Sequence, residues 1–341
     1  MTPIDLRASR GAPAPTLPEP RGPRSGALVD YLAGRTDHLP SAVRPVADVV
    51  GDDDLQLALY VAYELHHRGY DVGRDHEWDP EVLRFRAELE RTYEAGLRAM
   101  VPLPAGALDP DVPVAAALEG LVAAATGPSL SSFVATEGTL DHLREFAVHR
   151  SIYQLKEADG HTWAIPRYDG PSRSALIEIQ MDEYGNGVPG RAHAELFADT
   201  MDELGLDRRY GAYVDRVGAP TLATNTLLSL FGLHRRLLPA LLGHLAVFEM
   251  TSVVPMGRYA TACDRLVGTD RARRFYEVHV EADEHHGPLA RDVLAGCHVE
   301  RHPEDRALLL WGAAALMAVE ERFARSLLED WRCGRTSLRP A

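Results

Sequence analysis

The stretch Phe275-Tyr-Glu-Val-His279-Val-Glu281-Ala-Asp283-Glu284-His285-His286 is the part of the chain around which the rest is organised. Successive residues of a helix turn by about 100°, so positions i, i+4 and i+7 share one face. His279, Asp283 and His286 have this spacing, which predicts two imidazoles and a carboxylate side by side. Such a set suits a redox-active metal such as iron. The alternative is an acid-rich helix whose charged side chains simply face solvent.

The charge and the cysteine content restrict the kind of protein that this sequence encodes. The chain has 341 residues and a formal net charge of −14, whereas a general nucleic-acid binder is expected to be basic. Its three cysteines form no CxxC pair, which excludes a zinc ribbon and argues against a disulfide framework. The longest apolar run is taken to be residues 307–319, shorter than the roughly 20 residues of a membrane span. We therefore expect a cytoplasmic protein that binds neither nucleic acid nor membrane.

Apolar residues at helical spacing predict an all-α protein. Residues 1–25 are rich in proline and arginine and are predicted to form a flexible arm, followed by a single domain over residues 26–341. Ten or so helices are expected, including separate helices over 235–252 and 256–266 on either side of Pro255. Because no sustained alternation of apolar and polar residues indicates a strand, we expect a helical bundle.

A metal bound by three residues of one helix needs further ligands from facing helices. Charged residues within apolar helices are the candidates, because an unpaired charge there is costly. Glu157 and Glu183 each end an apolar helix, and His193 precedes another apolar run. Three glycines and a proline separate Glu183 from His193. We expect this segment to be mobile and to order as iron binds, which hydrogen exchange on metal-free and iron-loaded protein would test.

Four stretches of the sequence together resemble the haem-oxygenase-like diiron oxidase and oxygenase family, over about residues 50–335. They are Leu59-Tyr-Val-Ala-Tyr-Glu64-Leu-His-His-Arg-Gly-Tyr70, Ser151-Ile-Tyr-Gln-Leu-Lys-Glu157, Ala175-Leu-Ile-Glu-Ile-Gln-Met-Asp-Glu183 and His279-Val-Glu-Ala-Asp283-Glu-His-His286. The family's ligand pattern is a Glu, a second Glu 26 residues later, a His ten residues further, and a distant His-x3-Asp-x2-His. The residues that match every step are Glu157, Glu183, His193, His279, Asp283 and His286. The resemblance implies that these six residues bind metal within a haem-oxygenase-like helical bundle with additional helices.

The same resemblance implies the chemistry. Three carboxylates and three imidazoles would hold two iron ions, ferrous at rest and ferric after reaction with O2, and an external electron donor would restore the ferrous state. The ligand pattern is most similar to that of the family's N-oxygenases of specialised metabolism. We therefore expect oxygenation of a small amine, guanidine or amino-heteroarene to a hydroxylamine, nitroso or nitro product, for example of 2-aminoimidazole to 2-nitroimidazole.

Two other functions stay open on the sequence alone. The first is oxidative C–C cleavage or desaturation of an amino or fatty acid on the same diiron site. It would require an apolar tunnel or a carboxylate-binding arginine, for which Arg150, Arg167, Arg173 and Arg274 are candidates. The second is an iron-binding or storage protein without enzymatic activity, which would tolerate the loss of single ligands.

Four further residues are expected near the site. Glu64 forms a Glu-x-x-His pair in an early helix, and we expect it to hydrogen-bond to a ligand or to be structural rather than to bind metal. Tyr153 and Tyr184 flank predicted ligands and are candidates for the substrate pocket, with ordinary packing as the alternative. His285 lies one position off the ligand face, so we expect it to be exposed or to hydrogen-bond to a ligand. The expected partners are a small nitrogen-containing substrate and an external reductant, with a homodimer as an open possibility.

Overall fold

The structure is a computed structural model that describes residues 14–41, 45–103 and 105–340. All regular elements over these residues are helical, and none of the described residues forms a β-strand. This confirms the prediction of an all-α fold.

The α-helices are joined by connections of very different length. Their bounds are α1 Pro23–Leu32, α2 Asp53–Glu64, α3 Pro80–Met100, α4 Val114–Ala123, α5 Leu130–Thr136, α6 Leu140–Gln154, α7 Asp159–Thr162, α8 Gly170–Glu183, α9 His193–Glu203, α10 Ala219–Leu233, α11 Leu238–Leu266, α12 Asp270–Pro288, α13 Cys297–Arg301 and α14 Arg306–Arg332. A π-helix, Leu289–Gly296, continues α12 directly. Short 3-10 turns at Arg74–Trp78, Ala105–Leu108, Ile165–Arg167, Gly185–Gly187, Val214–Arg216, Arg235–Leu237 and Pro303–Asp305 complete the described elements.

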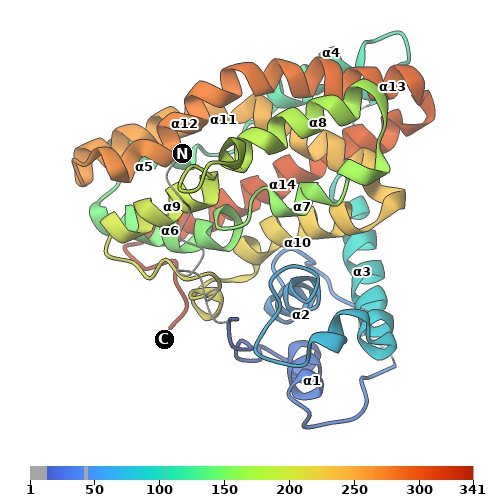
Figure 1. The fold of residues 1–341 in the computed structure, drawn as a ribbon, viewed down its shortest axis with the longest axis vertical. Helices are drawn as coiled ribbons and strands as arrows, with labels where there is room; N and C mark the ends of the chain where they lie inside the picture. The colour runs from blue at the N-terminus through green and yellow to red at the C-terminus, as the bar shows by residue number, and fades with distance from the viewer. Residues whose placement is uncertain (1–13, 42–44, 104, 341) are drawn as a thin grey trace, which may run out of the picture.

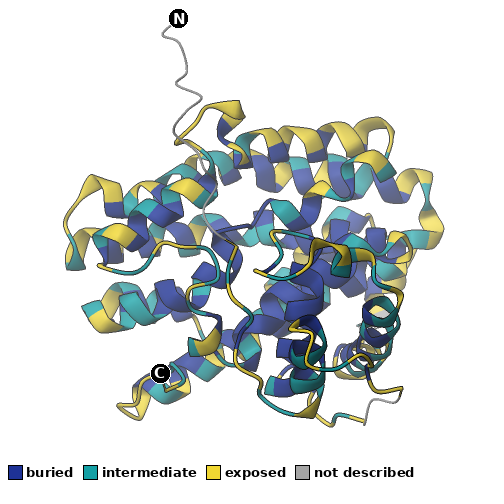
Figure 2. Cartoon of the chain, turned by 60° about the horizontal axis from the view of Figure 1, so that its bottom comes forward, coloured by how far each residue is buried: buried dark blue, intermediate teal, exposed yellow. Residues whose placement is uncertain are grey.

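Helix α11 is the central element of the bundle. It packs against α12 on one side and against α14 on another, and α9 lies on α12 (Figure 1). The N-terminal helices α1, α2 and α3 lie on one side of this assembly, where α2 contacts α10. Buried residues gather on the inward faces of the helices, and exposed residues lie on the outer faces and connections (Figure 2).

Two glycines bring α11 and α14 unusually close together. A Cβ added to Gly243 would collide with the carbonyl oxygen of Leu309, and one added to Gly312 would collide with that of Ala240. The two backbones are therefore in direct contact at this crossing. Because any larger side chain would push them apart, these glycines set the position of α11 relative to α14.

The structure describes only part of the predicted N-terminal arm. Residues 1–13 lie outside the described residues. From residue 14 onward the chain lies against the body: the Arg21 guanidinium donates to the carbonyl of Val214, and Asp54 accepts from both the backbone N–H and the hydroxyl of Ser25. Helix α1 begins at Pro23. The boundary at residue 25 stays a prediction, although residues of the 14–25 segment make these polar contacts with the rest of the chain.

Helix α11 also departs from the prediction. The sequence suggested two helices separated at Pro255, but α11 runs without interruption from Leu238 to Leu266 with Pro255 inside it. Residues Arg235–Leu266 are apolar and long enough to cross a membrane by length and composition, which corrects the expectation that residues 307–319 form the longest apolar run. Within the described chain, 72% of the most apolar window is buried. That burial is the environment of a core helix, and packing on both flanks explains why α11 tolerates its proline.

His149 leads to a prediction about stability in acid. Its ring nitrogens bond to the Thr221 hydroxyl at 2.6 Å and the Ser337 hydroxyl at 3.0 Å, and burial lowers its pKa to about 3. Between that value and the unfolded pKa of about 6.5, the unfolded chain binds a proton that the folded chain does not, so stability falls as pH falls. The metal-free wild type should therefore lose about 1.4 kcal/mol more per pH unit than His149→Gln in this window. Urea unfolding at several pH values between 6.5 and 4.5 measures this difference.

The control for this prediction is His302→Gln, because His302 lies at the surface. It should retain the wild-type pH dependence. Equal slopes for the wild type and His149→Gln would contradict the buried, neutral state of His149.

Candidate metal centre

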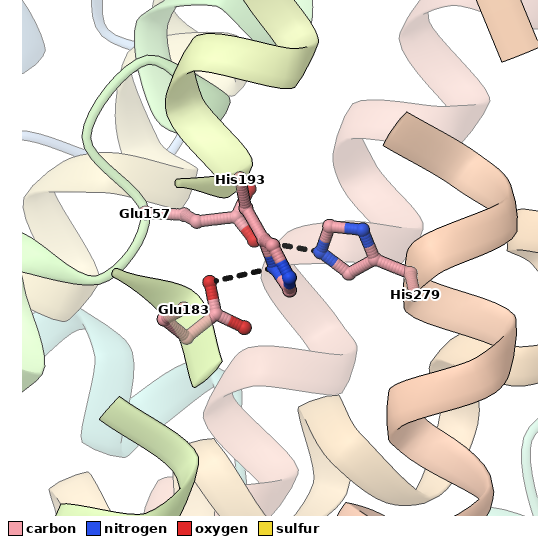
Figure 3. A group of neighbouring side chains, drawn as sticks. All are labelled: Glu157, Glu183, His193 and His279. Atoms are coloured by element: carbon pink, nitrogen blue, oxygen red, sulfur yellow. Dashed lines mark hydrogen bonds and ion pairs between the residues drawn. The ribbon is translucent and has the colours of Figure 1, made fainter. Parts of the chain in front are cut away.

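Four buried residues from separate parts of the chain form the first cluster. Glu157 lies in the turn after α6, Glu183 is the last residue of α8, His193 is the first residue of α9, and His279 lies in α12. One potential ligand atom from each lies within 4.8 Å of the others. Figure 3 shows the two carboxylates and the two imidazoles pointing toward one another.

The turn between α8 and α9 positions two of these residues. Gly185 has a φ of 64°, and a Cβ at this position would collide with the backbone of Arg191 and Ala192. Only glycine therefore fits where the chain folds back on itself. The turn brings the end of α8 to the start of α9, so that Glu183 and His193 face each other although an unbroken helix would separate them.

His279 is oriented as a metal-binding histidine usually is. Its Nδ1–H donates to the carbonyl of Phe275 at 2.8 Å, one turn earlier in α12, and its Nε2 lies 2.9 Å from Glu157 Oε1. A hydrogen bond from one ring nitrogen to a backbone carbonyl fixes the tautomer and leaves the other nitrogen for the metal. The backbone of α12 thus fixes which nitrogen faces the cluster.

Asp283 and His286 form a second cluster with Glu249, which the sequence analysis did not identify. His286 Nδ1 lies 3.7 Å from Asp283 Oδ1 and 3.8 Å from Glu249 Oε2, and all three residues are buried. Glu249 belongs to α11, and it is a carboxylate among the mainly apolar buried residues of that helix. The signal that could have identified it is the one that singled out Glu157 and Glu183: a carboxylate embedded in an apolar helix.

A small cavity joins the two clusters. It has a volume of about 20 Å³, and its lining includes Glu157, Glu183 and His279 from the first cluster and Glu249 and Asp283 from the second. That volume suits one or two water-sized groups rather than an organic molecule. Both sets of side chains therefore belong to one centre.

Crowded charges shift the pKa values of these side chains in opposite directions. Burial and the charge of Glu183 raise the pKa of Glu157, and burial with Asp283 and Glu183 raises the pKa of Glu249 well above its usual range. Burial alone would lower the pKa of His279, but the charge of Glu157 and the hydrogen bond to it outweigh burial and raise it to about 10. Four carboxylates in an apolar interior repel one another, and cations would relieve this repulsion.

The polar atoms left without a partner support a cation at this place. The buried atoms without a hydrogen-bond partner include Glu157 Oε2, Glu183 Oε2, His193 Nδ1, Asp283 Oδ1 and His286 Nδ1. Glu183 Oε2 and His193 Nδ1 lie 3.1 Å apart but are not aligned for a hydrogen bond. Unpaired buried polar atoms are rare in folded proteins, and here they face one another. Four carboxylates with three imidazoles and no thiolate form a donor set that fits iron.

The structure brings all six predicted ligands together. Of the four further residues that were expected near the site, some lie beside the cavity and others lie away from it. Tyr153 lines the small cavity and stacks on Phe248. Glu64 bonds to Lys156, the neighbour of Glu157 in the chain, and to Tyr210, rather than to a predicted ligand. Two residues lie at the surface: the Tyr184 hydroxyl donates to Asp159, and His285 bonds to Glu178. Neither of these two lines the small cavity.

Comparisons with known proteins agree with this centre. A family model described as iron-containing redox enzyme matches residues 144–321, just over half of the chain, which includes both clusters. Nitrosourea synthase of Streptomyces achromogenes subsp. streptozoticus is 30% identical over 149 residues, which make up 43% of this chain and 31% of that protein. The match thus spans about a third of the relative's length. Together these findings confirm the family resemblance that the sequence motifs suggested.

Proposed function

The chain belongs to the family of iron-containing redox enzymes, and on this premise we propose that it is a non-haem diiron oxygenase that N-oxygenates an amine, a guanidine or an amino-heteroarene. The observation that carries the proposal is the pair of buried clusters that share one small cavity. Two ferrous ions would bring four positive charges to the four carboxylates Glu157, Glu183, Glu249 and Asp283. Such a match of charge favours a two-metal centre over a single ion.

The irons, when bound, would supply O2 activation and oxygen transfer, while the chain holds the ligands and controls access. His279 is oriented through the Phe275 carbonyl, and the Ser252 hydroxyl donates to Asp283 Oδ2 at 2.5 Å. Phe275 also packs against the His279 ring, with centroids 4.4 Å apart. These contacts keep the donor atoms in place and exclude bulk water from a centre whose side chains are almost fully buried.

The stoichiometry explains why a reductant is needed. Each hydroxylation places one oxygen atom of O2 on the substrate nitrogen and reduces the other to water, which consumes two electrons and two protons. The chain contains no CxxC pair that could supply these electrons. An external electron donor is therefore part of the proposal, as is a small nitrogen-containing substrate.

The choice of nitrogen as the site of oxygenation rests on the relative. Nitrosourea synthase is named for a product that contains a nitrogen–nitrogen–oxygen group, and it is similar to 43% of this chain. A specific observation favours the second candidate, oxidative cleavage or desaturation of an acid. An apolar cavity lies beside the centre with Arg150 in its wall, as that function would require. Arg150, however, already binds Glu320 through both terminal nitrogens.

Anaerobic reconstitution with two equivalents of ferrous iron, followed by exposure to ¹⁸O2 with amines and acids, tests the proposal. Mass spectrometry should find a product with ¹⁸O on nitrogen. An alkene or a shortened acid would support the second candidate and reject N-oxygenation. Iron uptake without any O2-dependent product would indicate an iron-binding or storage protein instead.

A further inference from the structure

A second, larger cavity lies beside the candidate metal centre. Its volume is about 500 Å³, compared with about 20 Å³ between the ligands, which places it in the range of sites for drug-sized molecules. Helices α5, α6, α9, α11, α12 and α14 contribute to its wall. Exposed residues of the α4–α5 connection, such as Gly127, and exposed Glu321 of α14 also line it. The cavity therefore reaches the protein surface at this end.

On four segments of the chain, a residue of the cavity wall lies close in sequence to a residue of the two clusters. In each segment a wall residue lies three or four positions from a residue of the two clusters, which is about one helical turn. These pairs are Gln154 with Glu157, Phe197 with His193, Ser252 with Glu249, and Tyr276 with His279. Because the wall residue is about one turn from a cluster residue in all four segments, the cavity lies directly next to the centre.

Two residues mark the inner end of the cavity. Phe248 lines both this cavity and the small cavity between the ligands. Ser252 lines the larger cavity, and its hydroxyl donates to Asp283 of the second cluster. A molecule that fills the cavity would thus place one end against Phe248 and Ser252, next to the predicted iron ligands.

The polar groups of the wall favour a hydrogen-bond donor over an anion. The one permanent cation, Arg150, is paired with Glu320 at 2.7 and 3.0 Å and lies over the Phe323 ring, so its charge is already compensated. Thr251 and Pro255 both line the cavity, and Pro255 has no N–H to donate to the Thr251 carbonyl one turn earlier in α11. The buried side-chain oxygen of Gln154 also has no partner. Among the wall side chains, the Gln154 oxygen and the Tyr276 hydroxyl therefore lack a partner, whereas an entering carboxylate would meet a guanidinium that is already neutralised by Glu320.

We propose that this cavity is the substrate site of the enzyme and that it binds a lipophilic amine, with the nitrogen beside Ser252 and the apolar body among Phe146, Phe197 and Met256. This inference rests on the proposed N-oxygenase function and narrows its substrate. A molecule of the size of 2-aminoimidazole would fill only a small part of the cavity and would leave its apolar wall in contact with water. The substrate class is therefore an uncharged amine on a bulky, largely apolar body.

A different cleft provides the matched control. It has a volume of about 460 Å³, and its lining includes Glu249 and Asp283 together with the acidic residues Glu119 and Glu284. Ala123 at the exposed end of α4 lines this cleft, just as half-buried Ala318 of α14 lines the apolar cavity. Tryptophan at either alanine would narrow one of the two spaces. The substitutions are identical, and neither alanine belongs to the clusters.

Calorimetry on the iron-loaded protein without O2 tests the site directly. The probes are 4-butylaniline, which is uncharged at neutral pH, its acid counterpart 4-butylbenzoate, and 2-aminoimidazole. Wild-type protein and Ala123→Trp should bind 4-butylaniline more tightly than either other probe. Ala318→Trp should weaken its binding at least about tenfold while retaining the wild-type iron content. Ala324→Trp, which alters another wall position of α14, should have the same effect and replaces Ala318→Trp if that variant does not fold.

The outcomes separate this inference from the proposed function. Equal binding of 4-butylaniline by the wild type and both α14 variants would overturn the assignment of the cavity, as would tighter binding of 4-butylbenzoate or 2-aminoimidazole. Cavity-dependent binding of the amine without an N-oxygenated product after O2 exposure would instead reject the N-oxygenase function and leave the binding site standing. The expected result is that the wild type binds 4-butylaniline and forms an N-oxygenated product, and that Ala318→Trp is weakened in both.

Discussion

Replacing His279 by alanine is expected to abolish turnover and to lower the iron content of the protein. His279 is the ligand candidate whose orientation the backbone fixes most firmly, through its hydrogen bond to the Phe275 carbonyl. Its loss removes one of the four donors of the first cluster and leaves Glu157 buried without its nearest partner. Because changes at residues that only support a ligand already cost about 10–100-fold in metal affinity or activity, the loss of the ligand itself should cost more. Iron per chain and product formed per minute are the two measurements.

His302→Ala is the control, since it removes a histidine at the surface. It should keep the wild-type iron content and activity. Two irons per chain and full activity in His279→Ala would refute the assignment of His279 as a ligand.

Glu249→Gln is expected to have opposite effects on the metal-free and the iron-loaded protein. Burial with the charges of Asp283 and Glu183 raises the pKa of Glu249 well above that of an unfolded glutamate. The folded chain therefore binds a proton that the unfolded chain releases, and stability is lost as pH rises above about 4.5, the ordinary range of this carboxyl. A neutral amide of the same shape avoids this cost, so the metal-free variant should unfold at a higher temperature than the wild type, increasingly so toward neutral pH.

The same substitution should remove the second iron. An amide is a weaker ligand than a carboxylate, and without Glu249 the second cluster keeps only Asp283 and His286. We expect one tightly bound iron per chain in place of two and a loss of O2-dependent product. Thermal unfolding in chelator and metal analysis after reconstitution measure the two effects. Glu281→Gln, at an exposed site on α12, should change neither, whereas equal iron content in Glu249→Gln and the wild type would contradict the role of Glu249.

Much of the fold and of the candidate centre was predictable from particular residues. The i, i+4, i+7 spacing of His279, Asp283 and His286 depends only on helix geometry, and in the structure all three are buried on α12. Glu157, Glu183 and His193 were found because they are charged or polar residues beside apolar helices and because their spacing matches the family pattern. The structure brings these six together, although their role as ligands remains a prediction.

Other features could not be inferred from the sequence, for physical reasons. Glu249 has no partner residue at helical spacing within α11, and its neighbours in the centre come from α12, so only the packing of the two helices reveals it. Pro255 was read as a helix break because proline removes one hydrogen bond, but burial against neighbouring helices compensates for that loss. The apolar cavity is formed by six helices together, and no single segment carries a pattern that would indicate it.

The seven side chains of the two clusters come from helices α8, α9, α11 and α12 and from the turn after α6, and this distribution has a thermodynamic consequence. The unfolded chain scatters these groups, so ions that bind here bind the folded protein almost exclusively. Such linkage stabilises the fold by about 2.7 kcal/mol for each ion present at a hundred times its dissociation constant. The melting temperature of this protein should therefore rise with the concentration of free ferrous iron.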